Sequence, residues 1–343
     1  MTDFQRVQGF EEVWRPPVRP RFLVTRAALS GGRQTSGEAA RAKLSRIVAR
    51  APEVMVKVTG RTRDPGHLHA HLDYISRNGQ QDLETRDGAI LAGRAEVRDL
   101  AEGWSADQLA DPRTRGGAPF SHSLVLSMPA GTDPIALRDA ARTFAAGTFA
   151  RSHDYVFALH TDTPRPHVHL SVCSRGDRGE RLNPRKADLE QWRQTFAQAL
   201  RDRGVEAEAT PRRARGVTRK AERTPLRKIG DRAQAGGGAV SRVRRAAYQE
   251  AAKAAFGGDN GFRPWERRSA ERQAFVRRLY LAQAKLLRTS SNPQDQALGA
   301  KVEAFVLDMP HPDSLRLALA RELRAANRDV GHDRSSPDRD RRR

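Results

Sequence analysis

Valines occupy every second position over residues 54–58, so that they would all point to one side of an extended chain. A period of two residues is typical of a β-strand. After a polar turn, apolar side chains recur at helical spacing over residues 67–77, until Asn78 and Gly79 interrupt them. This pattern predicts a strand followed directly by a helix.

Further strands and helices are predicted up to residue 203. The strands cover residues 121–128, 155–159 and 168–173, and the helices cover residues 134–149 and 189–203. The last two strands are joined by residues 161–166, a loop too short for a crossover helix, so they must run antiparallel. We therefore expect an α+β fold with a central antiparallel sheet and flanking helices.

The chain changes character after this region. Residues 211–245 are strongly basic and contain three consecutive glycines, which predicts a basic linker on the surface. Residues 246–330 have helical periodicity, and an Arg-rich tail follows over residues 331–343. With residues 1–52 interpreted as a basic extension, the α+β domain is expected to span residues 53–210.

Positive charge is the strongest compositional signal. The 343 residues include 62 Lys and Arg against 41 Asp and Glu, a formal net charge of +21. This excess predicts a polyanionic partner, above all nucleic acid. Cys173 is the single cysteine and cannot form an internal disulfide, and the sequence has neither a secretory signal nor an apolar run of roughly 18 residues. We expect a cytoplasmic protein without membrane insertion.

Three histidines lie at the junction of two predicted strands, within residues 160–169. Residues i and i+2 of a strand point to the same face, so His167 and His169 present their imidazoles side by side. The short connection brings His160 alongside them. This convergence predicts a divalent-metal site with open coordination positions, and Asp162 could accept the free ring N–H of one ligand.

Two other interpretations of these histidines remain open. They could be exposed or structurally bonded side chains near a turn that bind no metal. His169-Leu170-Ser171 also matches one of the two His-x-Ser/Thr elements of a cyclic phosphodiesterase site, although no second element is evident. The third histidine across the hairpin favours the metal site.

Tyr74 lies on the predicted helix that follows the first strand, at the start of the sequence YISRNG over residues 74–79. A phenol is a weak nucleophile near neutral pH, and it needs a metal, a base or a phosphate placed in line. An isolated tyrosine would more often serve packing. His67, His69 and His71 precede it, but a spacing of two residues scatters side chains around a helix, so we do not expect them to bind a metal.

Together these motifs resemble those of the relaxases of the MOBP and T-DNA-border type, in the histidine-hydrophobe-histidine endonuclease superfamily. In that family a strand precedes a helix that bears a tyrosine, and a later strand ends in Ser-hydrophobe-Pro, which Ser127-Met128-Pro129 resembles. The motif His-x-Asp…Pro-His-x-His follows, as in residues 160–169. The resemblance covers about residues 53–210 and implies a nuclease domain with a central antiparallel sheet. Cys173 stands where the family usually has an asparagine.

The resemblance implies metal-dependent transesterification of single-stranded DNA at a transfer origin, for conjugative or mobilisation transfer. Tyr74 would attack a phosphate to give a 5′-phosphotyrosyl adduct, Asp162 would support catalysis, and the three histidines of residues 160–169 would hold Mg²⁺ or Mn²⁺. Implied partners are relaxosome accessory proteins and a type IV secretion coupling protein. The expected DNA contacts are Ser127, Arg77, Arg212, Arg213, Arg215, Arg219 and Lys220.

Two alternative functions remain. A rolling-circle replication initiator of the same superfamily uses the same chemistry, but it usually has its tyrosine after the His-x-His motif, whereas Tyr74 precedes it. A noncatalytic DNA-binding protein of the relaxosome would keep the fold without the reaction. The presence of both Tyr74 and all three histidines argues against this second alternative.

Overall fold

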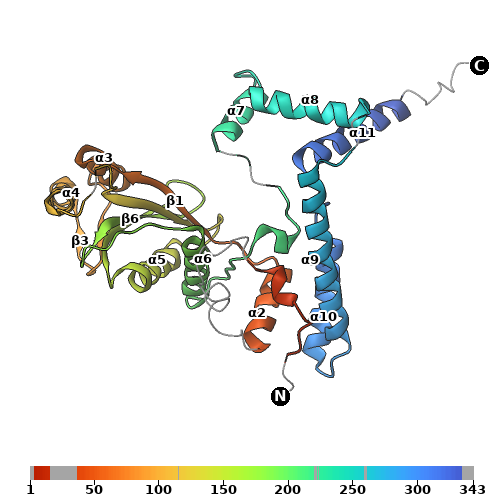
Figure 1. Ribbon diagram of the computed structural model, residues 1–343, viewed down its shortest axis with the longest axis horizontal. Helices are drawn as coiled ribbons and strands as arrows, with labels where there is room; N and C mark the ends of the chain where they lie inside the picture. The colour runs from red at the N-terminus through yellow and green to blue at the C-terminus, as the bar shows by residue number, and fades with distance from the viewer. Residues whose placement is uncertain are drawn as a thin grey trace, which may run out of the picture. The chain divides into compact units, whose positions relative to one another are not determined.

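A computed structural model describes residues 4–15, 37–114, 116–219, 222, 224–258 and 261–333 (Figure 1). The chain divides into two compact units. Unit 1 spans Arg15–Thr210, and unit 2 combines Phe4–Trp14 with Pro211–Arg343. The expected DNA contact Lys220 and residues 334–343 of the expected Arg-rich tail lie outside the described residues.

One antiparallel sheet forms the centre of unit 1. Among the described residues it has six strands in the order β1-β4-β6-β5-β2-β3. They are β1 (Met55–Thr62), β2 (Leu83–Thr85), β3 (Ile90–Leu91), β4 (Ser121–Ser127), β5 (His153–His160) and β6 (His167–Gly176). The predicted α+β fold with a central antiparallel sheet is confirmed.

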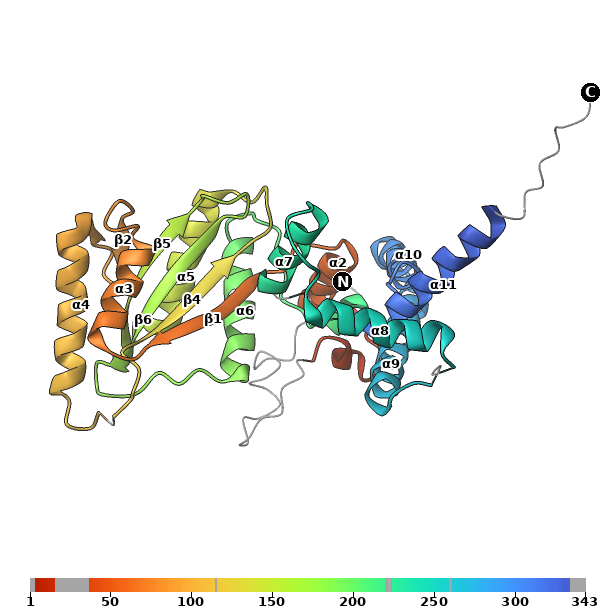
Figure 2. The same ribbon diagram turned by 90° about the horizontal axis from the view of Figure 1, so that it is seen from above.

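Helices cover both faces of this sheet. Helices α3 (Pro65–Ile75) and α4 (Gly93–Ala110) cover one face, and α5 (Pro134–Phe149) and α6 (Lys186–Arg201) cover the other. Figure 2 shows α3 and α4 to the left of the strands and α6 to their right. The alternation of side chains along each strand explains the two layers. In β6, Val168 and Val172 belong to the core under α5 and α6, whereas Cys173 belongs to the core under α3 and α4.

The segment that we expected as an extension, residues 1–52, is shared between the units. Helix α2 (Gly37–Val48) belongs to unit 1, where Arg46 Nε donates to the buried Glu208 carboxylate over 2.8 Å. The short 3-10 helix η1 (Phe10–Val13) belongs to unit 2, and the Phe10 ring packs edge-on against Tyr280. The apolar faces of both short helices are buried, which explains why they do not form a separate arm.

Unit 2 is helical throughout its described part. It contains the 3-10 helix η2 (Arg212–Arg215) and helices α7 (Thr224–Gln234), α8 (Arg242–Phe256), α9 (Pro264–Arg288), α10 (Pro293–Leu307) and α11 (Leu315–Asp333). Helix α10 packs on α9, and α11 packs on α8. The segment expected as a linker, residues 211–245, therefore contains η2, α7 and the start of α8. No helix in the described ranges has both the length and the hydropathy needed to cross a membrane.

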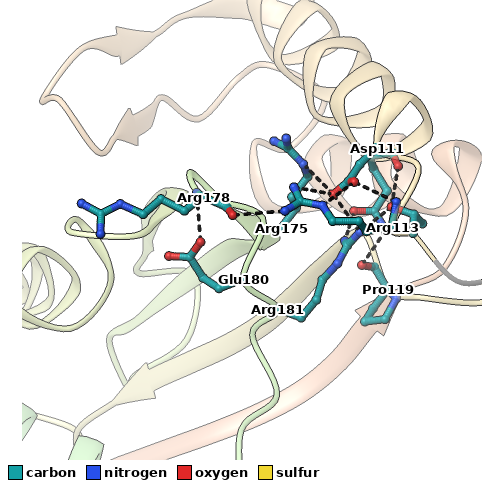
Figure 3. Close-up of polar contacts among 9 residues, drawn as sticks. Asp111, Arg113, Pro119, Arg175, Arg178, Glu180 and Arg181 are labelled. Carbon is teal, nitrogen blue, oxygen red and sulfur yellow. Dashed lines mark hydrogen bonds and ion pairs between the residues drawn. The ribbon is translucent and has the colours of Figure 1, made fainter.

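An ion-pair network closes the end of the sheet opposite the first residues of β6. Figure 3 shows Arg113, Arg175 and Arg181 reaching toward Asp111, which follows α4. Their guanidinium nitrogens lie 3.0, 3.2 and 3.5 Å from the Asp111 carboxylate, whose side chain is 1% exposed. Hydrogen bonds from Arg113 hold the pKa of Asp111 well below its usual range. The network ties the end of α4 to the end of β6 and the turn beyond it.

Candidate active site

Tyr74 lies on the solvent-exposed side of helix α3. Asp64 caps the helix by accepting a hydrogen bond from the backbone N–H of His67 over 2.7 Å, and Pro65 occupies the first helical position. Leu68 and Leu72 are fully buried toward the sheet. Tyr74 is 64% exposed, so its phenol is accessible from solvent rather than packed in the core.

The β5–β6 hairpin brings the three histidines together. His160 and His167 are directly paired across the two strands, and His169 follows two residues later on the same face. One nitrogen of each ring lies within 4.8 Å of the other two. The ring centroids are 4.6 to 5.5 Å apart. The convergence predicted from the sequence is confirmed.

Tyr74 lies against this group of histidines, which we call the histidine triad. Its ring meets that of His169 edge-on, with centroids 5.5 Å apart and an interplanar angle of 89°. Helix α3 and the β5–β6 hairpin therefore bring a phenol hydroxyl and three imidazoles to one place. A cleft of about 460 Å³ opens there, lined by Asp73, Tyr74, Arg77, Asn78, Gln80, His160, Asp162, Thr163 and His167.

Backbone carbonyls orient two rings of the triad. His160 Nε2 lies 2.8 Å from the Ile75 carbonyl oxygen, and His167 Nδ1 lies 3.1 Å from the Arg165 carbonyl oxygen. When these nitrogens carry the protons and donate, Nδ1 of His160 and Nε2 of His167 keep free lone pairs. Such bonds to the outer nitrogen are the usual way in which metal-binding histidines are fixed.

Burial favours the uncharged form of two histidines of the triad, His160 and His169. Loss of solvent around His169, with a smaller contribution from the neighbouring histidines, lowers its pKa to about 4. Burial also lowers the pKa of His160, against the hydrogen bond to Ile75. Neutral imidazole is the form that binds a metal, so the lowered pKa values of His160 and His169 fit a divalent ion, as does the three-histidine donor set.

Asp162 differs from our expectation. Among the described residues its carboxylate is not hydrogen-bonded to a histidine of the triad, because backbone carbonyls already occupy the outer nitrogens of His160 and His167. Asp162 instead forms an ion pair with Arg77, with Nη2 and Oδ2 2.8 Å apart. This pair joins the end of the Tyr74 helix to the β5–β6 loop at the rim of the cleft.

A tight turn ends α3 beside Tyr74. Arg77, Asn78 and Gly79 all have positive φ angles, of 51°, 56° and 81°. A Cβ at Gly79 would lie 2.4 Å from the backbone nitrogen of Arg94 at the start of α4, so only glycine fits this close approach. The turn aims Arg77 back across the cleft toward Asp162.

The other predicted DNA contacts occupy different surroundings. Ser127 is paired with His167 across β4 and β6, but it is only 7% exposed. In unit 2, Arg213 and Arg215 are half-buried, and Arg212 is exposed and donates to the Arg219 carbonyl over 2.7 Å. Arg212 and Arg219 are therefore the members of this set that are open to a phosphate backbone.

One polar contact close to Tyr74 was not predicted from the sequence. His71 Nε2 lies 2.9 Å from Ser123 Oγ, which connects α3 to the middle of β4. Burial lowers the pKa of His71 to about 4. Its position one turn before Tyr74 was the available signal, but its partner on a distant strand was not visible in the sequence.

Residues 74–205 match the family model described as relaxase, MobA/VirD2-like, nuclease domain. The T-DNA border endonuclease VirD2 of Rhizobium radiobacter is 27% identical over 186 residues, which cover 48% of this chain and 43% of that protein. The protein of the same name from Agrobacterium fabrum strain C58 is 25% identical over 184 residues, which cover 48% and 41%. The chain thus matches less than half the length of these relatives.

A chain from a solved structure entitled "Molecular Basis of Vancomycin Resistance Transfer in Staphylococcus aureus" aligns with 47% of this chain and 99% of its own length. Its identity is 14% and its TM-score is 0.32, which is too low to inform the fold. The family model and the sequence relatives agree with each other. The matched segment, residues 74–205, is therefore similar to the relaxase nuclease domain of MobA/VirD2-like proteins.

Proposed function

We propose that this chain nicks single-stranded DNA at a transfer origin by transesterification, with Tyr74 as the nucleophile. The observation that carries the proposal is the edge-on contact of Tyr74 with His169, at 5.5 Å between ring centroids, in an open cleft. A phosphate beside the histidine triad would lie next to the phenol oxygen. Placing reactants in this way supplies much of the rate enhancement in phosphoryl transfer.

His160, His167 and His169 would hold one divalent ion, Mg²⁺ or Mn²⁺, through neutral imidazole nitrogens. When bound, the ion would polarise the nonbridging oxygens of the scissile phosphate. Imidazole ligands suit manganese at least as well as magnesium, which prefers oxygen ligands. The carbonyl contacts of His160 and His167 would keep the ligand nitrogens aimed at the ion.

The chain's own residues would carry the bond changes. Tyr74 Oη forms a bond to phosphorus while the bond from phosphorus to the 3′ oxygen breaks. The phenol loses its proton, and the leaving 3′ oxygen gains one, so the products are a 5′-phosphotyrosyl protein and a free 3′-hydroxyl. No water is consumed, and the stored ester bond can later be transferred back to a hydroxyl. Arg77 would contact the phosphate at the cleft rim while Asp162 holds its guanidinium in place.

Unit 2 would bind the DNA backbone without sequence preference. Arg212 and Arg219 are exposed, and each phosphate that they neutralise would increase the salt dependence of binding. For the whole protein we propose a role in conjugative or mobilisation transfer, with relaxosome accessory proteins and a secretion coupling protein as partners.

The proposal can be tested with single-stranded oligonucleotides that tile the DNA next to the gene, incubated with Mn²⁺ or Mg²⁺. We expect one of them to be cut and to remain attached to the protein through its 5′ end. Tryptic mass spectrometry should then find the nucleotide on the peptide that contains Tyr74. Tight binding of the same oligonucleotides without any covalent product would favour the noncatalytic alternative.

A further inference from the structure

The sheet has one uncovered strip beside the histidine triad. Strand β1 lies at one edge of the sheet. The face of β1 that carries Val56, together with the preceding residue Val54, packs under α5 and α6. On its other side, no β1 residue belongs to the described core under α3 and α4, although α3 does contact β1. Met55 and Lys57 therefore remain exposed on the face that carries the triad.

The strand register places Lys57 in line with the triad. Lys57 is paired with Val125 on β4, and Val125 is paired with His169 on β6. Directly paired residues share a face, so Lys57 and His169 lie on the same side of the sheet, two strands and about 10 Å apart. Met55 is related to His167 in the same way through Ser127.

Among the described residues, no carboxylate forms an ion pair with Lys57. Within the described parts of the chain, no ion pair or hydrogen bond involves its ammonium group. An unpaired cation on an open strip is suited to a phosphate, and an apolar neighbour such as Met55, which is 47% exposed, is suited to the face of a base.

We propose that Lys57 binds the DNA phosphate next to the one held at the histidine triad, with the intervening nucleotide lying over Met55. This inference rests on the proposed function, since it assumes a single strand in the Tyr74 cleft. It adds a second anchoring point, so that the scissile phosphate is positioned from the sheet side as well as from the α3 side. Lys57 is thus a positioning residue for the substrate.

The chain offers a matched control on the same strand. A β-bulge between Val58 and Gly60 shifts the register, and Arg61 is paired with His122, whose face packs toward α5 and α6. Arg61 is exposed and cationic like Lys57 but points to the opposite side of the sheet. Replacing either residue with glutamine removes one positive charge from an exposed position of β1.

The test measures binding of a 12-nucleotide oligothymidylate to the full chain in EDTA, over a range of salt concentrations. For Lys57→Gln we expect lower affinity and a slope of log K against log salt reduced by about 0.7, the contribution of one single-strand phosphate contact. Lys57→Arg should restore the slope, and Arg61→Gln should leave it unchanged. In the unaltered protein, the oligonucleotide should protect Lys57 from acetylation, as read by mass spectrometry.

An unchanged slope in Lys57→Gln, together with unprotected Lys57, would overturn the inference while leaving the proposed function intact. Failure of the unaltered protein to bind the oligonucleotide at all would instead count against the proposed function. Equal loss of slope in Lys57→Gln and Arg61→Gln would identify a general charge effect and would also overturn the inference.

Discussion

His160 Nε2 lies 2.8 Å from the carbonyl oxygen of Ile75, the residue directly after Tyr74. This contact joins the proposed nucleophile helix to the proposed metal site through one hydrogen bond. Because the carbonyl belongs to the last residue of α3, any movement of this helix would turn the His160 ring. Nucleophile and triad are therefore positioned by each other.

Tyr74→Phe should abolish the covalent DNA adduct while leaving DNA affinity nearly unchanged, because only the attacking oxygen is removed. Denaturing gel electrophoresis of protein with a labelled oligonucleotide measures the adduct. Tyr155→Phe is the matched control, since Tyr155 is 2% exposed and faces α5 and α6. Adduct formation by Tyr74→Phe would show that the nucleophile lies elsewhere.

His169→Ala should remove metal binding, because it takes away one of three converging ligands. Calorimetry with Mn²⁺ should show a clear loss of affinity, and nicking should fall in parallel. His67→Ala serves as the control, because His67 is exposed on α3 and is not a member of the triad. If both variants bind Mn²⁺ like the unaltered protein, the ion is held by other groups.

Asp162→Asn should reduce nicking with little change in the free energy of unfolding, since its ion pair with Arg77 joins side chains that are 40% and 49% exposed. The physical reason is loss of the partner that holds Arg77 at the cleft. A double-mutant cycle with Arg77→Gln measures the coupling. Additive losses in the double variant would mean that Asp162 does not act through Arg77.

The stability of unit 1 should fall in acid, in part through His122. This side chain is fully buried with Nδ1 2.9 Å from Ser174 Oγ, and burial lowers its pKa from 6.5 to about 4. The unfolded chain therefore binds the proton first, so the contribution of His122 is complete above pH 6.5 and is lost as the pH falls toward 4.

Urea titrations between pH 7 and pH 4 can isolate this effect. His122→Asn should lower the free energy of unfolding at every pH, because the bond to Ser174 changes. It should also flatten the pH dependence in this range by up to about 1.4 kcal/mol per pH unit, the value for one proton. An unchanged slope in His122→Asn would refute the assignment.

The four arginines predicted to contact DNA in unit 2 should separate into two classes. Arg219→Gln should weaken binding to long DNA and reduce the salt slope by about 0.7 to 0.9, because Arg219 is exposed. Arg215→Gln should mainly lower thermal stability, since Arg215 is half-buried in η2. Fluorescence anisotropy and thermal unfolding, measured on both variants, distinguish the two effects.

Much of the fold was predictable because its signals are local. The alternating valines at β1 and the helical spacing of apolar residues in α5 reflect which side chains of each segment are buried. Such patterns can be recognised within one segment. The triad was also predictable, since a short loop forces β5 and β6 into an antiparallel pair. Its bound metal and the role of Tyr74 stay predictions.

Features that depend on distant partners were not predictable. The pairing of Asp162 with Arg77 depends on a left-handed turn after α3, and residues 83–85 gave no sign that β2 would pair with β5. Helix α2 was interpreted as part of an extension because its partner, Glu208, lies far along the chain. Only the folded chain brings such residues together.

The order of the site residues along the chain has a consequence for biosynthesis. Tyr74 leaves the ribosome well before His160, His167 and His169, and two of these histidines belong to β6, which lies between β4 and β5 in the sheet. A nascent or truncated chain that ends before β6 therefore carries Tyr74 and His160 without His167 and His169. Under the proposed mechanism such a fragment would lack two of the three metal ligands, and we expect it to be unable to nick DNA.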